Sequence, residues 1–205
     1  MTQIRTEEEN RMDALAFLRR EHESVLGMFE VLDGAPRGTG AQQSGLATMV
    51  ENLVIAESQH EAIEEQLFWP AVRDALDDGD ELADHAISQE EAGKKLLQQL
   101  ADGAPGEAEY HAALDEFIKA GREHIAYEQD VVWPRLSAAV SDERLEKLGH
   151  ELEAAKKMAA TRPHPDTPSS SAVQKTVGVA AAVVDHVRDA VSGRDRQNPP
   201  DPPTS

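Results

Sequence analysis

The sequence predicts an all-α protein whose main domain is an antiparallel up-down four-helix bundle. Four long segments repeat apolar residues at steps of three and four, which is the period of an amphipathic helix. Short Gly- and Pro-rich stretches separate these segments, so successive helices are expected to run antiparallel. Aromatic residues make up only 4 % of the chain, while Ala, Leu and Glu are abundant, and this composition favours helices over sheets.

Each of the four segments presents one apolar stripe. The stripes run from Leu15 to Leu32, from Leu46 to Ala71, from Leu82 to Leu100 and from Leu114 to Val131. The breaks between them read DGAPRGTG, DDGDE and ADGAPGE. We therefore expect the bundle to occupy residues 10–140.

The remainder of the chain is expected to form appendages. Residues 141–160 predict an additional helix with Ser141 as its N-cap, and residues 161–171 read as a Pro/Ser linker. A second apolar stripe predicts an amphipathic C-terminal helix over 172–193, followed by a disordered tail over 194–205. That helix is expected to dock on the bundle, to form a homodimer or to bind a protein partner. Its few, mixed charges make membrane attachment the weakest interpretation.

Charge and composition exclude several classes of function. The formal net charge is −19, which repels phosphate backbones and argues against nucleic-acid binding. The absence of Cys excludes disulfides, iron–sulfur clusters and thiol catalysis. The polar, acidic N-terminus is unlike a signal peptide, and no apolar run reaches membrane-spanning length. The expected location is cytoplasmic.

One motif occurs twice in the same register. Residues 60–70 read HEAIEEQLFWP and residues 124–134 read HIAYEQDVVWP, so both copies spell H-x-x-x-E followed by Trp-Pro. Positions i and i+4 of a helix lie about 40° apart, so each His/Glu pair can hold one metal ion from one helix face. Trp69 and Trp133 precede prolines at positions where helices are expected to end, and we expect them to cap the end of the bundle rather than to contact a substrate.

The metal-binding interpretation depends on where these polar residues fall. They interrupt stripes that otherwise read as core, and a carboxylate in a bundle interior costs several kcal/mol unless it is paired or bound to a cation. The first and third segments add one donor each at equivalent positions of the two hairpins. The predicted ligands are His22, His60, Glu64, Glu90, His124 and Glu128. Two ions bridged by Glu64 and Glu128 would satisfy every buried carboxylate, and mixed imidazole and carboxylate donors suit iron or manganese better than zinc.

The roles of three further residues near the predicted site are not decided by the sequence. Glu57 lies on the inward stripe as an extra ligand or as an acceptor behind an imidazole, and its counterpart Gly121 is expected to leave space opposite it. Tyr127 can hydrogen-bond the site or pack. His85 is the alternative to Glu90, but a separation of five residues points the two about 140° apart. The apolar stripe favours Glu90, and whether it or His85 completes the site stays open.

These segments resemble the hemerythrin-like, or HHE cation-binding, domain family. The match lies in REHESVL, HEAIEEQLFWP and HIAYEQDVVWP and extends over about residues 12–136. The resemblance implies a hemerythrin-type four-helix bundle with a cofactor of two non-haem iron ions, bridged by carboxylate and oxo groups. The third-helix position, His in most of the family, is Glu90 here, which weakens the expectation of reversible oxygen transport.

The expected function is therefore a di-iron protein that reacts with or senses dioxygen, peroxide or nitric oxide. Peroxide consumption, of a catalase- or peroxidase-like kind, and redox sensing are favoured over oxygen transport. The alternative is a non-catalytic iron or oxygen sensor, or an iron-holding protein, that signals through a partner. A metalloprotease is not expected, because HEAIE lacks the second His of H-E-x-x-H.

Overall fold

The computed structural model describes residues 13–38 and 40–159. Its regular elements are α2 (Ala14–Asp33), α3 (Ala41–Ile63), η1 (Glu64–Phe68), α4 (Trp69–Ala75), α5 (Gly79–Asp102), α6 (Ala108–Tyr127), η2 (Glu128–Val132), α7 (Trp133–Ala139) and α8 (Asp142–Lys156). Within the described ranges all of these are helical, with η1 and η2 in the wider π form. The predicted linker, C-terminal helix and tail lie outside the described residues, as do residues 10–12 of the predicted bundle.

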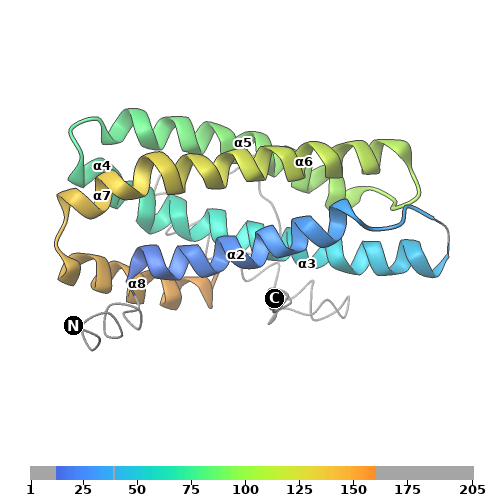
Figure 1. Ribbon diagram of the computed structural model, residues 1–205, viewed down its shortest axis with the longest axis horizontal. Helices are drawn as coiled ribbons and strands as arrows, with labels where there is room; N and C mark the ends of the chain where they lie inside the picture. Colours follow the sequence, from blue (N-terminus) through green and yellow to red (C-terminus); the bar gives the residue numbers. More distant parts are fainter. Residues whose placement is uncertain (1–12, 39, 160–205) are drawn as a thin grey trace, which may run out of the picture.

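The four long helices form the predicted antiparallel bundle (Figure 1). Helix α2 packs beside α3 and α6, and α5 packs beside the same two helices. The short helices α4 and α7 prolong the second and fourth helices at one end of the bundle, and α8 returns along α2 (Figure 1). The prediction of an all-α bundle with an extra helix after it is therefore confirmed.

The core consists of two apolar clusters with a polar layer between them. One cluster lies at the end that carries α4, α7 and α8, and its largest buried members are Phe17, Leu18, Ile63, Phe68, Trp69, Trp133 and Leu136. The other fills the opposite half, with Val25, Phe29, Leu53, Leu97, Leu114 and Phe117 among its members. His22 falls between Leu18 and Val25 along α2, so the boundary between the clusters is the level of the predicted ligands.

The two Trp-Pro pairs do not end their helices, which corrects the expectation drawn from the prolines. At both places a five-residue π turn leads directly into a seven-residue α-helix. The N–H of Trp69 bonds the carbonyl of Glu64, and that of Trp133 bonds the carbonyl of Glu128. Pro70 and Pro134 then stand in the first turn of α4 and α7, where a helix does not need the missing N–H.

Helix α8 closes one side of the bundle. The Ser141 hydroxyl accepts a hydrogen bond from the backbone N–H of Arg144 at 3.3 Å, as predicted for its N-cap. Leu145, Leu148 and Leu152 are buried in the first apolar cluster. Gly149 allows the close approach to α2, because a Cβ there would lie 2.6 Å from the backbone carbon of Asp13.

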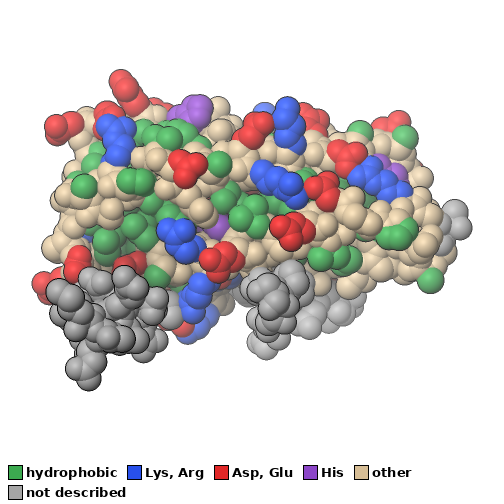
Figure 2. Space-filling model, viewed as in Figure 1, with side chains coloured by type: hydrophobic (Ala, Val, Ile, Leu, Met, Phe, Trp, Pro, Cys, Tyr) green, Lys and Arg blue, Asp and Glu red, His purple; other side chains and the backbone are tan. Residues whose placement is uncertain are grey.

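Charged side chains of both signs are interspersed with apolar ones on the face shown in Figure 2. Among the described residues, no helix combines the length and hydrophobicity that a membrane crossing requires.

Candidate metal centre

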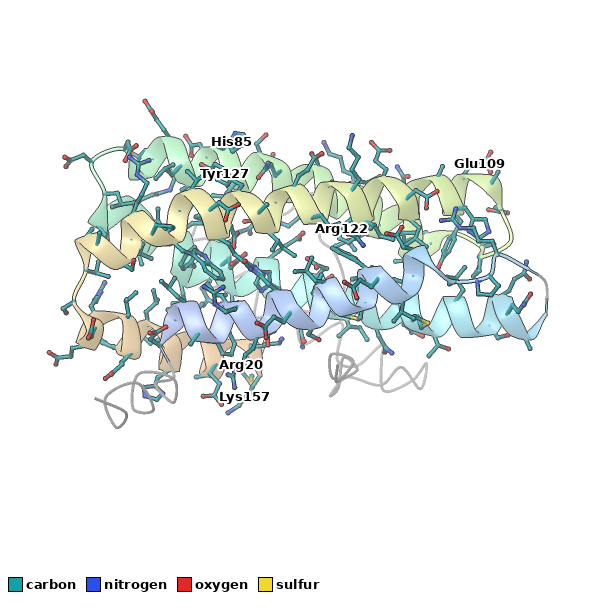
Figure 3. All side chains as sticks on the ribbon, in the orientation of Figure 1. Arg20, His85, Glu109, Arg122, Tyr127 and Lys157 are labelled. Carbon is teal, nitrogen blue, oxygen red and sulfur yellow. The ribbon has the colours of Figure 1, made fainter. Side chains whose placement is uncertain are left out.

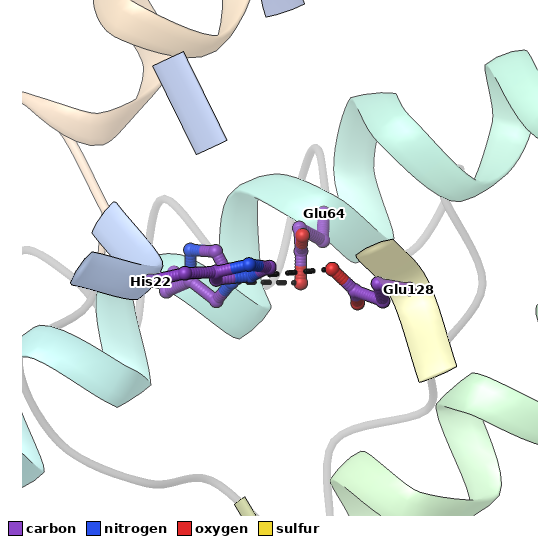
Figure 4. Close-up of side chains that lie close together, drawn as sticks. His22, Glu64 and Glu128 are labelled. Atoms are coloured by element: carbon purple, nitrogen blue, oxygen red, sulfur yellow. Dashed lines mark hydrogen bonds and ion pairs between the residues drawn. The ribbon is translucent and has the colours of Figure 1, made fainter. Parts of the chain in front are cut away.

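The six predicted ligands converge in the polar layer of the bundle. They come from α2 (His22), α3 (His60), η1 (Glu64), α5 (Glu90), α6 (His124) and η2 (Glu128). Figure 4 shows the imidazole of His22 and the carboxylates of Glu64 and Glu128 facing one another. His22, Glu64 and Glu128 are each at most 1 % exposed, so bulk water does not solvate these groups.

The donors form two overlapping groups. His22, His60, Glu64 and Glu128 make one group, and Glu64, Glu90, His124 and Glu128 make the other. In each group one ligand atom from every residue lies within 4.8 Å of the others, a spacing that a single cation can bridge. Since Glu64 and Glu128 belong to both groups, the arrangement offers two neighbouring cation positions with two shared carboxylates.

Distances within the cluster show how Glu128 joins the two groups. Its Oε2 lies 3.2 Å from Nε2 of His22, and its Oε1 lies 3.0 Å from Nε2 of His124. Glu128 therefore turns one oxygen toward each position. On the other helix pair, Nε2 of His60 lies 3.2 Å from Oε2 of Glu64 and 3.1 Å from Nε2 of His22.

Unpartnered polar atoms test whether these residues fit a metal. Apart from these approaches between imidazoles and carboxylates, both carboxylate oxygens of Glu64 and of Glu128, Oε2 of Glu90 and Nε2 of His124 are buried without a hydrogen-bond partner. Buried carboxylates without partners are costly, and bound cations are one of the few ways to compensate them. Imidazole nitrogens and carboxylate oxygens are donors that iron and manganese accept. The donor set and its geometry fit a pair of such ions.

Electrostatics in the layer reflect crowding of acids in a dry interior. Burial raises the pKa of Glu64 well above its usual range, and the charge of Glu128 adds to this effect. Burial likewise raises the pKa of Glu90 to about 8. Burial, and then the neighbouring His22, lower the pKa of His60 to about 3. His60 is thus neutral at pH 7, the form in which an imidazole binds metal.

Glu128 and His124 titrate in the opposite direction. Burial opposes ionisation of Glu128, but the imidazoles of His124 and His22 hold its pKa well below the usual range. Burial also lowers the pKa of His124, yet the carboxylates around it, Glu128 first, raise the pKa to about 9. In the absence of a cation, the imidazolium of His124 thus balances the charge of Glu128.

The two tryptophans contact the cluster, although the sequence did not predict it. The indole N–H of Trp69 donates to Oε1 of Glu90, and the ring of Trp133 stacks on His22 with centroids 5.1 Å apart and planes 10° apart. The repeated Trp-Pro pair was the available signal. The pattern predicts that the rings cap the end of the bundle, but the π turns carry both rings into the interior.

Two glutamines also contact the cluster without having been predicted. Oε1 of Gln89 lies 3.1 Å from Nδ1 of His124, and Nε2 of Gln129 lies 3.0 Å from Nδ1 of His22. Each glutamine is the chain neighbour of a carboxylate in the cluster, Glu90 or Glu128. That adjacency was the one signal in the sequence.

The structure shows which of the residues with undecided roles lie in the cluster and which lie outside it. Glu90 is 2 % exposed and belongs to the cluster, whereas His85 lies on the surface. Tyr127 is not brought into the cluster: its ring contacts His85, and its hydroxyl donates to the carbonyl of Leu82 at 3.3 Å. Figure 3 shows His85 and Tyr127 together on the outer side of α5 and α6.

Glu57 lies near the cluster but in neither donor group. It is 7 % exposed, and burial raises its pKa to about 7, with the charges of His124 and Glu128 acting in opposite senses. The space expected opposite it at Gly121 is filled, because a Cβ there would lie 2.7 Å from Cζ of Phe29.

A buried ion pair stands beside the second donor group and was also missed. The ammonium of Lys94 on α5 contacts a carboxylate oxygen of Glu65 on η1, and both side chains are at most 9 % exposed. Glu61 lies near both, and burial raises its pKa well above the usual range. The spacing of Glu57, Glu61 and Glu65 at steps of four placed them on one face, which was the signal available.

Comparison with known proteins agrees with this geometry. The hemerythrin HHE cation binding domain matches residues 13–136. A hemerythrin-like protein of Schizosaccharomyces pombe, itself described as uncharacterized, is 26 % identical over 145 residues, which cover 70 % of this chain and 71 % of that protein. No solved structure matches the chain. With the family match spanning all four long helices and the six clustered donors, the chain belongs to the hemerythrin HHE cation-binding domain family.

Proposed function

We propose that this protein binds two iron ions in the cluster and consumes peroxide or responds to cellular redox state through them. The observation that supports the proposal most directly is the sharing of Glu64 and Glu128 by two donor groups. When bound, a pair of irons supplies one-electron chemistry with small oxygen species. His22, His60, Glu64, Glu90, His124 and Glu128 would hold the pair.

Burial around the donors restricts the reactant. Because His22, Glu64 and Glu128 are at most 1 % exposed, only molecules of a few atoms can reach them without opening the bundle. Dioxygen, peroxide and nitric oxide meet this condition, whereas larger organic substrates do not.

The donor set favours reaction over reversible transport. The donor set consists of three carboxylates and three imidazoles. With Glu90 in place of a histidine, the set carries one more negative charge than a set with four imidazoles would. Hard, anionic oxygen donors stabilise the ferric state relative to the ferrous state. A carrier must return to the ferrous state after each cycle, so Glu90 makes transport the less suitable role.

The test loads the metal-free full chain anaerobically with Fe(II), removes unbound ions and measures iron per chain. We expect two irons, and oxygen release from added hydrogen peroxide that exceeds the release by an equal concentration of free iron. Glu128→Gln, which removes a shared carboxylate, should lose both ions and the activity. Glu61→Gln is the matched control, because it makes the same substitution at a buried glutamate outside the donor groups and should keep two irons.

Two results would contradict the proposal. A wild-type chain that retains less than one iron would remove the paired site. A chain with two irons, no peroxide turnover above free iron and no redox-dependent change in its spectrum would remove the reactive role while leaving iron binding intact.

A further inference from the structure

The three imidazoles of the cluster differ in the partner of Nδ1, the ring nitrogen that points away from the other donors. Nδ1 of His124 lies against the side-chain oxygen of Gln89, and Nδ1 of His22 lies against the side-chain nitrogen of Gln129. Nδ1 of His60 is buried without a partner. Each glutamine reaches from one helix to another, since Gln89 joins α5 to α6 and Gln129 joins η2 to α2.

The orientation of each amide fixes where a neutral imidazole carries its proton. The oxygen of Gln89 can only accept, so Nδ1 of His124 is the donor, and loss of the Nε2 proton from the imidazolium leaves a lone pair that faces the cluster. The nitrogen of Gln129 can only donate, so Nδ1 of His22 accepts. The proton of neutral His22 then stands on Nε2, which lies 3.2 Å from Oε2 of Glu128.

These tautomers have different consequences for metal binding. An imidazole ligates through a nitrogen lone pair, and its other N–H needs an acceptor that holds the ring in place. His124 reaches this arrangement by releasing its Nε2 proton alone, because its Nδ1–H already faces an acceptor. His22 does not, because its inward nitrogen is protonated and its outer nitrogen faces a donor. For His22 to ligate, Nε2 must release its proton to solvent water, Nδ1 must take one up, and the amide of Gln129 must turn over to accept it, with no net change in protons.

Access to solvent distinguishes the same two positions. The side chain of His124 is 12 % exposed, whereas those of His22 and His60 are 1 % and 4 % exposed. The ring of His22 is further restrained by stacking on Trp133. An ion that enters from solvent therefore meets the His124 side of the cluster first.

We propose that Gln89 and Gln129 are positioning residues that make the two cation positions unequal: the Glu90/His124 position fills first, and the His22/His60 position fills only after the amide of Gln129 turns over. The inference builds on the proposed binding of two ions, and it adds an order of filling and the side chains that set it. Neither glutamine contacts the cations; each acts through the imidazole that it holds.

The first measurement is the tautomer of each histidine in the metal-free full chain, by long-range ¹H–¹⁵N correlation spectra of the imidazoles. We expect the Nε2–H form for His22. Zn(II), a diamagnetic probe, is then added up to two equivalents. The first equivalent should shift the His124 signals, and the second should shift those of His22 and His60 and convert His22 to the Nδ1–H form.

Substitutions separate positioning from a general loss of structure. Gln129→Met should weaken binding of the second equivalent about 10- to 100-fold while leaving the first unchanged. Gln129→Glu should rescue it, because a carboxylate accepts the Nδ1–H without turning over. Gln89→Met should weaken the first equivalent, with rescue by Gln89→Glu. Gln59→Met is the matched control, since Gln59 is a buried glutamine next to His60 in the chain, and it should change neither step.

Several outcomes would overturn the inference. His22 in the Nδ1–H form before metal is added, simultaneous shifts of His22 and His124, or Gln129→Met binding indistinguishable from wild type would each do so. In those cases two ions still bind, and the proposed function stands. A wild-type chain that binds neither Zn(II) nor Fe(II) would overturn both proposals.

Discussion

His22 in the first helical hairpin (residues 14–75) and Glu90 in the second (79–139) occupy equivalent positions, yet their neighbours differ. Trp133 stacks on His22, whereas Trp69, its counterpart in the other hairpin, donates its indole N–H to Glu90. Gln129 contacts the outer nitrogen of His22. The counterpart of Gln129 in the first hairpin is Glu65.

Glu65 explains why a lysine enters the interior on this side only. Glu61, Glu65 and Glu90 are three acids in one dry region, and Lys94 pairs with Glu65 and also faces Glu61 and Glu90. The position equivalent to Lys94 in the first hairpin is Leu26, which packs against the apolar core. In this chain the exchange of an imidazole donor for a carboxylate is accompanied by two changes around it: an N–H donor replaces a stacked ring, and a cation replaces an apolar side chain.

Replacing Lys94 by leucine, the residue at the equivalent position of the first hairpin, is expected to destabilise the protein more than any of the substitutions that follow. Lys94→Leu removes the ammonium that pairs with buried Glu65, and we expect a loss of about 3–5 kcal/mol in the free energy of unfolding. Adding Glu65→Gln converts the partner position to its counterpart in the other hairpin as well, and it should recover most of the loss. Urea unfolding of the metal-free proteins measures both. A double variant no more stable than Lys94→Leu would show that the ion pair is not the reason.

The second difference between the hairpins lies at Glu57 and Gly121. Gly121→Ala places a methyl group 2.7 Å from Cζ of fully buried Phe29, so we expect a loss of about 1–3 kcal/mol from overpacking. Gly45→Ala is the control, since nothing lies within 4 Å of a Cβ at that helical position. It should stabilise by up to about 1 kcal/mol through helix propensity. Equal effects of the two substitutions would argue against close packing at Gly121.

The pH dependence of the metal-free protein tests the same pair of positions. The pKa of Glu57 rises from 4.5 to about 7 on folding, so the folded chain holds a proton that the unfolded chain releases. Stability from this group is therefore lost as pH rises from about 4.5 to 7. Glu90, with its pKa raised to about 8, acts in the same direction, whereas His60, lowered to about 3, gains stability up to its usual pKa of 6.5.

The substitution Glu57→Gln separates the contribution of Glu57 to the pH dependence of stability from the contributions of Glu90 and His60. The variant should be more stable than the wild type by an amount that grows between pH 5 and pH 7 and is constant above that range. Thermal unfolding midpoints of both metal-free proteins at half-unit intervals measure the difference. A difference that does not change with pH would mean that Glu57 ionises at its ordinary pKa. Retention of two irons by the variant would also exclude Glu57 as a required ligand.

The smallest effect is expected at an ion pair on the surface between the hairpins. Arg37, in the connection after α2, donates from Nη1 to Oδ2 of Asp115 on α6 at 2.8 Å. The side chains are 33 % and 52 % exposed, so solvent screens the pair and Arg37→Ala should cost less than about 1 kcal/mol. The difference from wild type should shrink further in 1 M NaCl. A larger, salt-independent loss would indicate a packing role for the Arg37 stem.

Sequence periodicity was sufficient for the bundle and for the placement of the six clustered donors, because a helix repeats its buried face and exposes any polar residue on that face as an anomaly. Periodicity also favours Glu90 over His85, and the structure brings Glu90 into the cluster. The residues behind the donors were missed for a physical reason. Gln89 and Gln129 lie beside the inward stripe and reach another helix, so their partners are decided by tertiary packing.

The prolines misled for a related reason. A proline in a helical pattern normally indicates an end or a kink, but a π turn before it lets the next helix begin with proline in its first turn. Helix propensity accounts for the missing N–H of proline, but it does not account for a preceding π turn that removes the need for that N–H. The interior positions of Trp69 and Trp133 could not be predicted without that turn.

The π turns at 64–68 and 128–132 each take up one residue more per turn than regular helix would. Removing a single residue from 65–68 would therefore return the segment to ordinary winding and leave the direction of helix α4 nearly unchanged. Removing a residue between His60 and Glu64 would instead rotate Glu64 by about 100° relative to His60, although every donor was still present. The number of residues is thus part of the site's specification inside each H-x-x-x-E motif, and much less so in the turn that follows it.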